Sequence, residues 1–390
     1  MEGYLDRTDQ GRCGDLPIPA PGLLLVGAAG RNAGKTEFAC RVLERVTGAG
    51  ARPVAAAKVT TVQEADGICP RGGEGCGACA TLESDWCISE ELDRSGPKDT
   101  SRLLRAGGSR VFWLRVLEGS LLAGAQKLQS QVGPSRPWVC ESNRLRRALD
   151  PDLFVLVREA GSGPLKPSAA SVAGLADAVV VSDGRTFEPE PNAVSLLDGV
   201  WTMRRDATAI VLAGGRSTRM GTDKSLLDLS GRPLIAHVVD QVRPQASRVL
   251  LSAPTCERFS FLGLPVALDR IAGAGPLAAV ASALEDSTTD WNLVVPCDMP
   301  RVPARLVTQM FRMREGVDAV VPTSGRHFEP LFALYRKSCL PAMRKMVLGG
   351  GRKIIDVFRQ IAVRTLPLPD DVRLLNINTP EDFRDFGGRG

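Results

Sequence analysis

A glycine- and arginine-rich segment follows an apolar run near the middle of the chain. It reads LAGGRSTRMGTDK over residues 212–224, and the run before it, residues 208–212, has the composition of a β-strand. Gly214 and Gly215 would let backbone N–H groups approach phosphate oxygens that a Cβ would block. The cations placed to neutralise a pyrophosphate are Arg216, Arg219 and Lys224. The segment predicts a loop that wraps a nucleoside triphosphate, and an ordinary turn with solvated cations is the alternative.

A carboxylate ends a second apolar run downstream. Residues 291–295 form an apolar strand, and Asp298 follows it within PCDMP, residues 296–300. Open α/β sheets gather their ligand groups at the carboxyl ends of parallel strands. Mg²⁺ prefers oxygen ligands, so Asp298 is a candidate to hold Mg²⁺ shared with a triphosphate. The alternative is an aspartate that only shapes the turn.

Apolar periodicity predicts strands alternating with helices in both halves of the chain. In the second half we expect helices over 234–242 and 277–284 and strands over 225–229, 247–251 and 266–268. Alternation of this kind predicts α/β domains with mainly parallel sheets. The expected fold is two doubly wound α/β domains, a P-loop NTPase-like domain followed by a Rossmann-like nucleotidyltransferase domain.

Six segments of the second half resemble the molybdenum cofactor guanylyltransferases. From about residue 207 onward they are LAGGRSTRMGTDK, GRPL, the stretch from Asp269 to GAGPLAAV, VVPCDMP, EPLFALY and NINTPEDF. The resemblance implies transfer of GMP from GTP to the phosphate of molybdopterin, with release of pyrophosphate. The expected partners are therefore GTP and molybdopterin or the molybdenum cofactor. Molybdoenzyme-maturation proteins are candidate protein partners.

The resemblance also implies residue roles. Leu212, Ala213, Gly214 and Asp269 would contact the guanine nucleotide, Lys224 would neutralise the triphosphate, and Asp298 would bind Mg²⁺. With the residues that the loop itself suggests, Gly215 joins the expected nucleotide-binding set, and Arg219 joins Lys224 and Asp298 in the expected catalytic set. The chain departs from the family at residues 252–254 (SAP), where many members carry an asparagine that helps read the nucleotide. LAGG in place of LAAG favours guanylyl over cytidylyl transfer. The rival functions are cytidylyl or sugar-phosphate nucleotidyl transfer, and a non-catalytic nucleotide- and metal-sensing delivery module.

A second nucleotide signal lies near the start of the chain. Residues 22–26 form a compact apolar strand that runs into GAAGRNAGKT, residues 27–36, and a helix is expected over 37–47. The end of this segment matches the P-loop, although Ala29 occupies its first glycine position. Lys35 would reach the β- and γ-phosphates and Thr36 would bind Mg²⁺, while the backbone from Gly30 to Gly34 cradles phosphate. The alternative is a fortuitous GKT in a turn.

This first half resembles the GTP-binding accessory protein of molybdopterin guanine dinucleotide synthesis. The segments that carry the resemblance are AGRNAGKT, RPVAAAKVT, KDTSRLLRAGG and Glu141, which follows an apolar strand over 137–140. Glu141 is expected to orient Mg²⁺-bound water, and a carboxylate that only favours a helix N-terminus is the alternative. Further strands are expected over 54–58, 153–157 and 178–181.

Four of the ten cysteines crowd into one segment, CPRGGEGCGACATLESDWC. They are Cys69, Cys76, Cys79 and Cys87. Four thiolates can bind Zn²⁺ or an iron–sulfur cluster, and Cys76 and Cys79 form a CxxC pair. The spacing matches no standard zinc finger, so redox-active or disulfide-forming cysteines and incidental thiols remain as alternatives.

Length and composition place limits on the other possibilities. The 390 residues are 44% hydrophobic and 24% charged, with a net charge of +5, which is too mild to argue for nucleic acid binding. We expect no signal peptide, no membrane span and a reducing cytoplasm. The expected boundaries are a flexible lead-in over 1–20, a P-loop GTP-binding domain over 21–185 with a Cys-rich insertion at 66–90, a solvated linker over 186–206, and a nucleotidyltransferase domain over 207–390.

Overall fold

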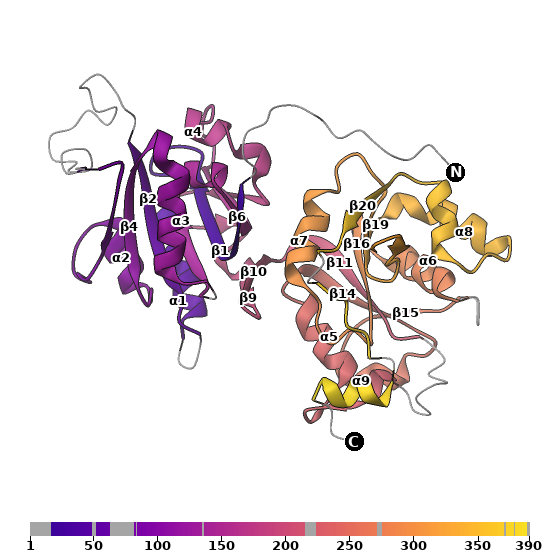
Figure 1. Cartoon of the computed structure of the whole chain (residues 1–390). Helices are drawn as coiled ribbons and strands as arrows, with labels where there is room; N and C mark the ends of the chain where they lie inside the picture. Colours follow the sequence, from indigo (N-terminus) through magenta and orange to yellow (C-terminus); the bar gives the residue numbers. More distant parts are fainter. Residues whose placement is uncertain are drawn as a thin grey trace.

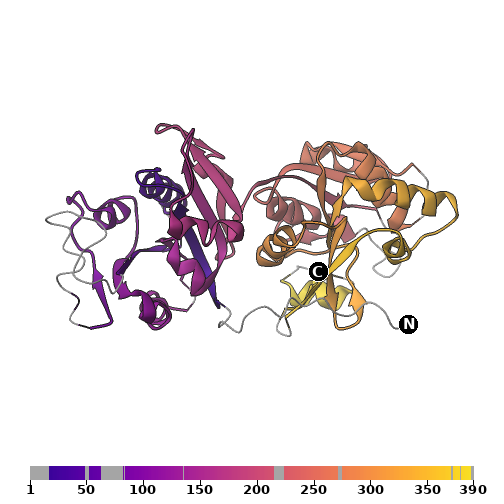
Figure 2. The ribbon, with the colours of Figure 1, turned by 90° about the horizontal axis from the view of Figure 1, so that it is seen from above.

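The chain forms two α/β halves that lie side by side and are joined near Arg204 (Figures 1 and 2). The computed structural model describes residues 17–48, 52–62, 82, 84–134, 136–214, 224–270, 275–369, 372–377 and 379–387. Each half is built around one large sheet. Among the described residues, no helix has the length and apolar character that crossing a membrane requires.

The first half contains an eight-stranded sheet. Its strands are β1 (Ile18–Ala28), β2 (Ala55–Val62), β3 (Trp86–Glu90), β4 (Val111–Leu117), β5 (Trp138–Glu141), β6 (Leu149–Glu159), β7 (Ala178–Ser182) and β8 (Phe187–Glu188). Its helices are α1 (Lys35–Val46), α2 (Asp99–Arg105), α3 (Leu121–Val132) and α4 (Pro167–Ala170). The strand order is β3-β4-β2-β5-β1-β6-β7-β8, parallel except for β3 and β8 at the edges.

Apolar residues cover both faces of this sheet. On β1, Leu24 and Val26 enter the core beneath α1 and α2, whereas Leu23 and Leu25 enter the core beneath α3. Successive side chains of a strand point to opposite faces, so a strand apolar at every position must be covered on both sides. The continuous apolar run at the start of the chain therefore becomes a central strand with helices on both faces.

The second half is built from a mixed sheet and a short two-stranded ribbon. Its strands are β11 (Arg205–Leu212), β12 (Asp228–Leu229), β13 (Arg232–Pro233), β14 (Ala246–Ala253), β15 (Val266–Leu268), β16 (Trp291–Pro296), β17 (Ala319–Ser324), β18 (His327–Phe328), β19 (Ala333–Arg336) and β20 (Val363–Pro367). Its helices are α5 (Leu234–Val242), α6 (Pro276–Asp286), α7 (Ala304–Arg312), α8 (Leu340–Leu348) and α9 (Pro380–Asp385).

The order of the main sheet is β15-β14-β11-β16-β19-β17-β18, and β20 pairs with β17. Strands β15, β14, β11 and β16 are parallel, and β19 runs antiparallel between β16 and β17. Helices α5 and α7 cover one face, and α6 and α8 cover the other. The short strands β12 and β13 form a separate ribbon. The α/β class is confirmed, with the sheet more mixed than we expected.

The segment 186–206, expected to be a solvated linker, is folded onto the first half. It contains β8 and a hairpin of β9 (Val194–Leu197) and β10 (Val200–Met203). Phe187, Trp201 and Met203 are buried in the core beneath α1. The Trp201 indole N–H donates to the Gly22 carbonyl oxygen at 2.9 Å. Burial of these large apolar side chains outweighs the polar and proline-rich character of residues 188–192.

Three smaller expectations also differ from the structure. Residues 18–20, expected to belong to the flexible lead-in over 1–20, form the beginning of β1 and pair with β6. The Cys-rich insertion at 66–90 ends in β3, which pairs with β4 at the sheet edge. Lys224–Leu226 is a 3₁₀ turn, and only Asp228–Leu229 of the strand expected over 225–229 is extended.

Candidate functional site

Three strand ends of the second half lie side by side in register. Leu212, the last residue of β11, pairs with Ser252 of β14 and with Pro296 of β16. The Ala213 N–H donates to the Ser252 carbonyl oxygen at 2.8 Å, and the Cys297 N–H donates to the Leu212 carbonyl oxygen at 3.1 Å. The loops after these strands therefore begin at one edge of the sheet, where open α/β folds place ligands.

A lysine and a carboxylate face each other at this edge. Lys224 Nζ lies 3.8 Å from Asp298 Oδ2, and their side chains are 15% and 22% exposed. Burial raises the pKa of Asp298, and the positive charge of Lys224 opposes that rise. A further cation near such a buried carboxylate would stabilise its charged form.

Asp269 reaches the same edge from the end of β15. Its Oδ2 would lie 3.4 Å from a Cβ placed on Gly214, so the carboxylate sits directly against the start of the glycine-rich loop. Burial raises the pKa of Asp269, and a hydrogen bond from Ser252 lowers it. Its Oδ1 is buried and has no hydrogen-bond partner among the described residues. An unpaired buried oxygen at a strand edge is a place for a ligand donor.

One polar residue at this site was missed from the sequence. The Ile377 N–H donates to the Asp298 carbonyl oxygen at 2.8 Å, which brings the NINTPEDF segment to the 297–303 loop. The neighbouring Asn376 has a buried Oδ1 with no hydrogen-bond partner among the described residues. The signal was the pair of asparagines in NINTPEDF, which we used for the resemblance without assigning a role.

Two expected site residues, Gly215 and Arg219, lie outside the described residues, as does Arg216. The described ones meet at one edge of the sheet. These are Leu212, Ala213, Gly214, Lys224, Asp269 and Asp298. The arrangement places a cation, two carboxylates and a glycine backbone where one phosphorylated ligand could touch all of them.

Comparisons with known proteins match the half that carries this edge. The model of the MobA-like NTP transferase domain matches residues 209–364. A probable molybdenum cofactor guanylyltransferase of Carboxydothermus hydrogenoformans is 38% identical over 186 residues, which are 46% of this chain and 94% of that protein. The chain belongs to the molybdenum cofactor guanylyltransferase family. Its second half, the transferase half, is a nucleotidyltransferase domain.

Two more relatives match a similar share of this chain. The molybdenum cofactor guanylyltransferase of Vibrio parahaemolyticus is 34% identical and covers 46% of this chain and 93% of its own length. The solved structure of molybdopterin-guanine dinucleotide biosynthesis protein A from Archaeoglobus fulgidus is 25% identical, covers 46% of this chain and 96% of its own, and has a TM-score of 0.41.

A second cluster of polar groups lies beside the GAAGRNAGKT segment, residues 27–36, in the first half. Gly34 precedes α1 with φ +85°, a left-handed conformation that favours glycine. Its φ and the Phe187 ring, which would lie 3.2 Å from a Cβ, both argue against any larger residue. Lys166 Nζ donates to the Gly30 carbonyl oxygen at 3.4 Å. Helix α1 therefore begins directly after Gly34, close to where the sequence predicted a helix to start.

Glu141 lies at the centre of this cluster. The Thr36 hydroxyl donates to Glu141 Oε2 at 3.1 Å, and Lys35 Nζ lies 3.5 Å from the same oxygen. The Glu141 side chain is fully buried, and its Oε1 has no hydrogen-bond partner among the described residues. Burial raises the pKa of Glu141, and the charge of Lys35 lowers it. Glu141, which we predicted from a different segment, is thus brought against Lys35 and Thr36.

Asp99 and Lys58 form an ion pair beside this cluster. Burial alone would raise the pKa of Asp99, but the hydrogen bond and charge of Lys58 hold it below its usual value. Lys58 ends the expected 54–58 strand, and Asp99 belongs to the KDTSRLLRAGG segment. The sequence assigns no role to either residue, because the two lie 41 positions apart and only the fold brings them together. Arg102 of the same segment contacts Glu37 Oε2 at 2.6 Å and ties α2 to α1.

Of the clustered cysteines, only Cys87 lies among the described residues, on β3, where Arg115 Nη2 is 3.3 Å from its sulfur. Cys69, Cys76 and Cys79 lie outside them. Among the described residues there is no group of three or more histidine, cysteine, aspartate and glutamate side chains suited to a metal ion.

Proposed function

We propose that the transferase half transfers GMP from GTP to the phosphate of molybdopterin and releases pyrophosphate. The observation that carries this proposal is the meeting of Lys224, Asp298 and Asp269 at the registered ends of β11, β14 and β16. Names of relatives that are molybdenum cofactor guanylyltransferases support the choice of substrates. The product is a guanine dinucleotide form of the cofactor.

The chemistry asks for charge stabilisation rather than for a strong base. A phosphate oxygen of molybdopterin attacks the α-phosphorus of GTP, the bond to the bridging oxygen breaks, and pyrophosphate leaves with the electron pair. The nucleophile is already anionic, so no proton has to be removed. Lys224 stabilises the charge that develops on phosphate oxygens, and backbone N–H groups at Gly214 add fixed donors.

The residues at this edge fit Mg²⁺. Asp298 is a largely buried carboxylate with a raised pKa, and Asn376 Oδ1 and Asp269 Oδ1 are buried oxygens without hydrogen-bond partners among the described residues. Mg²⁺ takes oxygen ligands and is commonly held by one or two carboxylates and phosphate. In our proposal Asp298 holds the ion, which when bound neutralises phosphate charge, and Asp269 contacts the nucleotide.

For the first half we propose a GTP-binding accessory domain of the same biosynthesis. Gly34, Lys35 and Thr36 hold the phosphates and Mg²⁺, and Glu141 orients Mg²⁺-bound water. The contacts of Glu141 with Thr36 and Lys35 support this assignment. We extend it to Asp99, which pairs with Lys58 and also interacts with Thr36 and with the charge of Lys35.

We also propose that Cys69, Cys76, Cys79 and Cys87 bind Zn²⁺ or an iron–sulfur cluster. The CxxC pair and the crowding of four thiols within 19 residues support this proposal. The spacing does not choose between the two kinds of centre.

One experiment tests the proposed reaction. The full chain is incubated with molybdopterin, Mg²⁺ and GTP, CTP or UTP in turn, and the nucleotide products and pyrophosphate are analysed. We expect a guanine dinucleotide and pyrophosphate with GTP only. Transfer from CTP or UTP would replace the proposal with another nucleotidyl transfer. Binding of GTP and molybdopterin without any pyrophosphate would favour the delivery module.

A further inference from the structure

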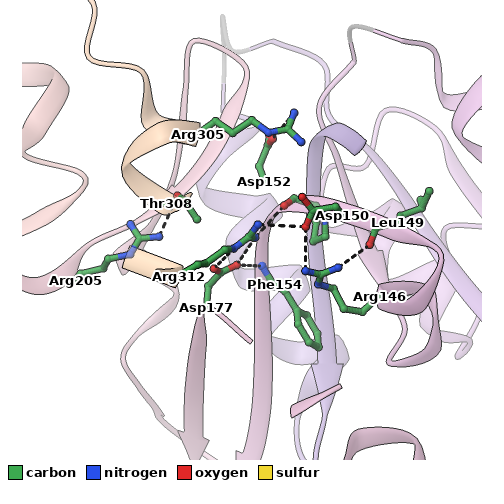
Figure 3. Close-up of polar contacts among 11 residues, drawn as sticks. Arg146, Leu149, Asp150, Asp152, Phe154, Asp177, Arg205, Arg305, Thr308 and Arg312 are labelled. Atoms are coloured by element: carbon green, nitrogen blue, oxygen red, sulfur yellow. Dashed lines mark hydrogen bonds and ion pairs between the residues drawn. The ribbon is translucent and has the colours of Figure 1, made fainter. Parts of the chain in front are cut away.

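Helix α7 of the transferase half presents an arginine near each end to carboxylates of the first half (Figure 3). Arg312 is at its last position and contacts both oxygens of Asp177, at 2.6 and 2.8 Å. It also lies 3.2 Å from Asp150 Oδ1 and donates to the Pro151 carbonyl oxygen at 3.0 Å. Two parallel contacts to one carboxylate fix the angle as well as the distance, because the guanidinium is a rigid planar fork.

The carboxylates that receive these arginines are themselves held by the first half. The Asp177 side chain is 2% exposed, and its Oδ2 accepts from the Phe154 N–H at 2.7 Å. Asp152 is fully buried and accepts from the Gly22 N–H at 2.8 Å, and Arg305 of α7 lies 3.8 Å from its Oδ1. A buried carboxylate needs a cation nearby, so α7 neutralises charge that the first half has already fixed in place.

A third connection runs through α5. The Gln241 Nε2 donates to Asp198 Oδ2, in the turn between β9 and β10, at 3.3 Å. The Gln241 Oε1 accepts from the Val302 N–H at 3.2 Å. Val302 lies in the loop of residues 297–303, which joins β16 to α7 and carries Asp298. The first half therefore reaches the end of this loop that leads into α7, through Gln241 and through Arg305.

The two nucleotide segments lie at the far ends of strands that begin near this contact. Asp152 accepts a hydrogen bond from the Gly22 N–H, in the first half of β1. The GAAGRNAGKT segment continues from the other end of β1, at Ala28. Arg205 begins β11 and donates to Thr308 of α7 at 3.0 Å, and the glycine-rich loop follows Leu212 at the other end. At about 3.3 Å of rise per strand residue, each loop begins roughly 20 Å from the contact between the two halves. The described contacts thus link the halves through α7 and α5, away from both loops.

We propose that the first half is a positioning partner of the transferase site. By holding α7 through Arg312 and Arg305, and the 297–303 loop through Gln241, it fixes the direction in which Asp298 presents its carboxylate to Mg²⁺. Arg312 is a positioning residue and touches no substrate. This inference rests on the proposed role of Asp298 in the transfer reaction.

The test uses the full chain with Arg312→Ala, Arg312→Lys, and Arg336→Ala as the matched control. Arg336 forms an Arg–Asp pair with Asp290 at 2.9 Å within the transferase half, on the opposite end of β16 from Asp298. Two quantities are measured: the Mg²⁺ concentration for half-maximal GMP transfer, and hydrogen exchange of the peptide covering 297–303. Exchange requires no activity, so it is read even if the proposed reaction fails.

We expect Arg312→Ala to raise the half-saturating Mg²⁺ concentration about fivefold to tenfold, in the lower part of the usual range for coupled sites. Exchange of the 297–303 peptide should accelerate, Arg312→Lys should lie between Arg312→Ala and the unaltered protein, and Arg336→Ala should change neither quantity. An unchanged Mg²⁺ requirement in a folded, active Arg312→Ala protein overturns the proposal.

Two further outcomes are distinguishable. If the unaltered protein transfers no GMP, the proposed function has failed, and the exchange of 297–303 alone then decides the positioning proposal. If Arg312→Ala does not fold, Asp177→Asn replaces it, because the amide keeps one acceptor for the Phe154 N–H while removing the charge that Arg312 meets. An unchanged exchange rate in either variant would reject the inference.

Discussion

Lys224 and Asp298 are 74 positions apart in the chain, yet Lys224 Nζ lies 3.8 Å from Asp298 Oδ2. The pair forms because β11 and β16 are parallel neighbours whose ends are in register, so their following loops leave the same edge of the sheet. Burial raises the pKa of the carboxyl and the lysine opposes that rise. The chemistry that we propose for the transferase half depends on this pair.

Asp298→Asn should abolish Mg²⁺-dependent transfer and leave the fold intact. The amide has nearly the same shape but lacks the charge that holds Mg²⁺, so we expect the rate to fall by about 10²–10³-fold or more. Product formation and circular dichroism are the measurements. Asp290→Asn is the control, because Asp290 is exposed and precedes β16 at its other end. Retained turnover would remove Asp298 from its role.

Lys224→Ala should shift the acidic limb of the pH–rate profile for GMP transfer to higher pH. The raised pKa of Asp298 means that the carboxylate is protonated, and loses its affinity for Mg²⁺, as the pH falls through that pKa. Removal of Lys224 takes away the positive charge that lowers this pKa, so protonation begins at a higher pH. The pH dependence of the residual rate at saturating GTP measures the shift. A limb that stays in place or moves to lower pH would contradict the proposed pairing.

Lys35→Ala should reduce the number of GTP sites in the full chain from two to one. Lys35 lies 3.5 Å from Glu141, and in our proposal its ammonium reaches the β- and γ-phosphates of a bound GTP. Equilibrium titration with a non-hydrolysable GTP analogue in the presence of Mg²⁺ measures the stoichiometry. Lys345→Ala, on the exposed face of α8, should leave two sites. Two sites in the Lys35→Ala protein would exclude the P-loop reading.

The double change Cys76→Ser with Cys79→Ser should lower the metal content of the purified protein. Loss of two thiolates leaves too few ligands for a tetrahedral centre. Elemental analysis for zinc and iron, together with acid-labile sulfide, measures the effect and identifies the centre. Cys256→Ser alters an exposed thiol elsewhere and serves as the control. Equal metal in all three proteins would dismiss the four-cysteine site.

Asp152→Asn should remove a pH dependence of stability between about pH 4 and pH 6. Burial raises the pKa of Asp152 to about 6, although Arg305, the backbone hydrogen bonds and Arg312 act to lower it. An unfolded aspartate titrates near about 3.9, so between these values the folded state binds the extra proton. This carboxyl therefore makes the free energy of unfolding fall as the pH rises from 4 to 6.

The asparagine can keep both backbone contacts of Asp152, because the Gly22 and Trp201 N–H groups donate to the same oxygen, Oδ2. Urea unfolding at pH 4, 5, 6 and 8 compares the two proteins. We expect the difference in unfolding free energy between them to change across pH 4 to 6 and to be constant above pH 7. A difference that is constant from pH 4 to 8 would show that Asp152 is ionised throughout.

Local sequence patterns determined much of the fold. Continuous apolar runs bounded by glycine or a carboxylate predicted β1, β5, β11 and β16, and the structure confirms each of them within a few residues. The helix expected over 277–284 is α6, which begins at Pro276. These features depend on short-range hydrophobic patterning and on backbone preferences of single residues, which are legible without any tertiary contact.

The sequence misled where burial overrode local composition. Residues 188–192, EPEPN, predicted a solvated linker, yet Phe187 and Trp201 on either side of them are buried in the first core. Asn376 gave no sign of its position either, because only the Ile377 contact with Asp298 brings it to the site. Both outcomes depend on which distant surface a segment packs against.

The sequence by itself determined the two α/β halves, the glycine-containing segment that follows an apolar strand in each of them, and the residue types available for the chemistry that we propose. Only the tertiary structure decided that Asp298 faces Lys224, that Asp99 and Lys58 join Glu141, and that Arg312 of one half meets Asp177 of the other. The physical reason is that charge pairing is set by distance in space, and the register of parallel strands and the packing of α7 bring together groups that no sequence spacing relates.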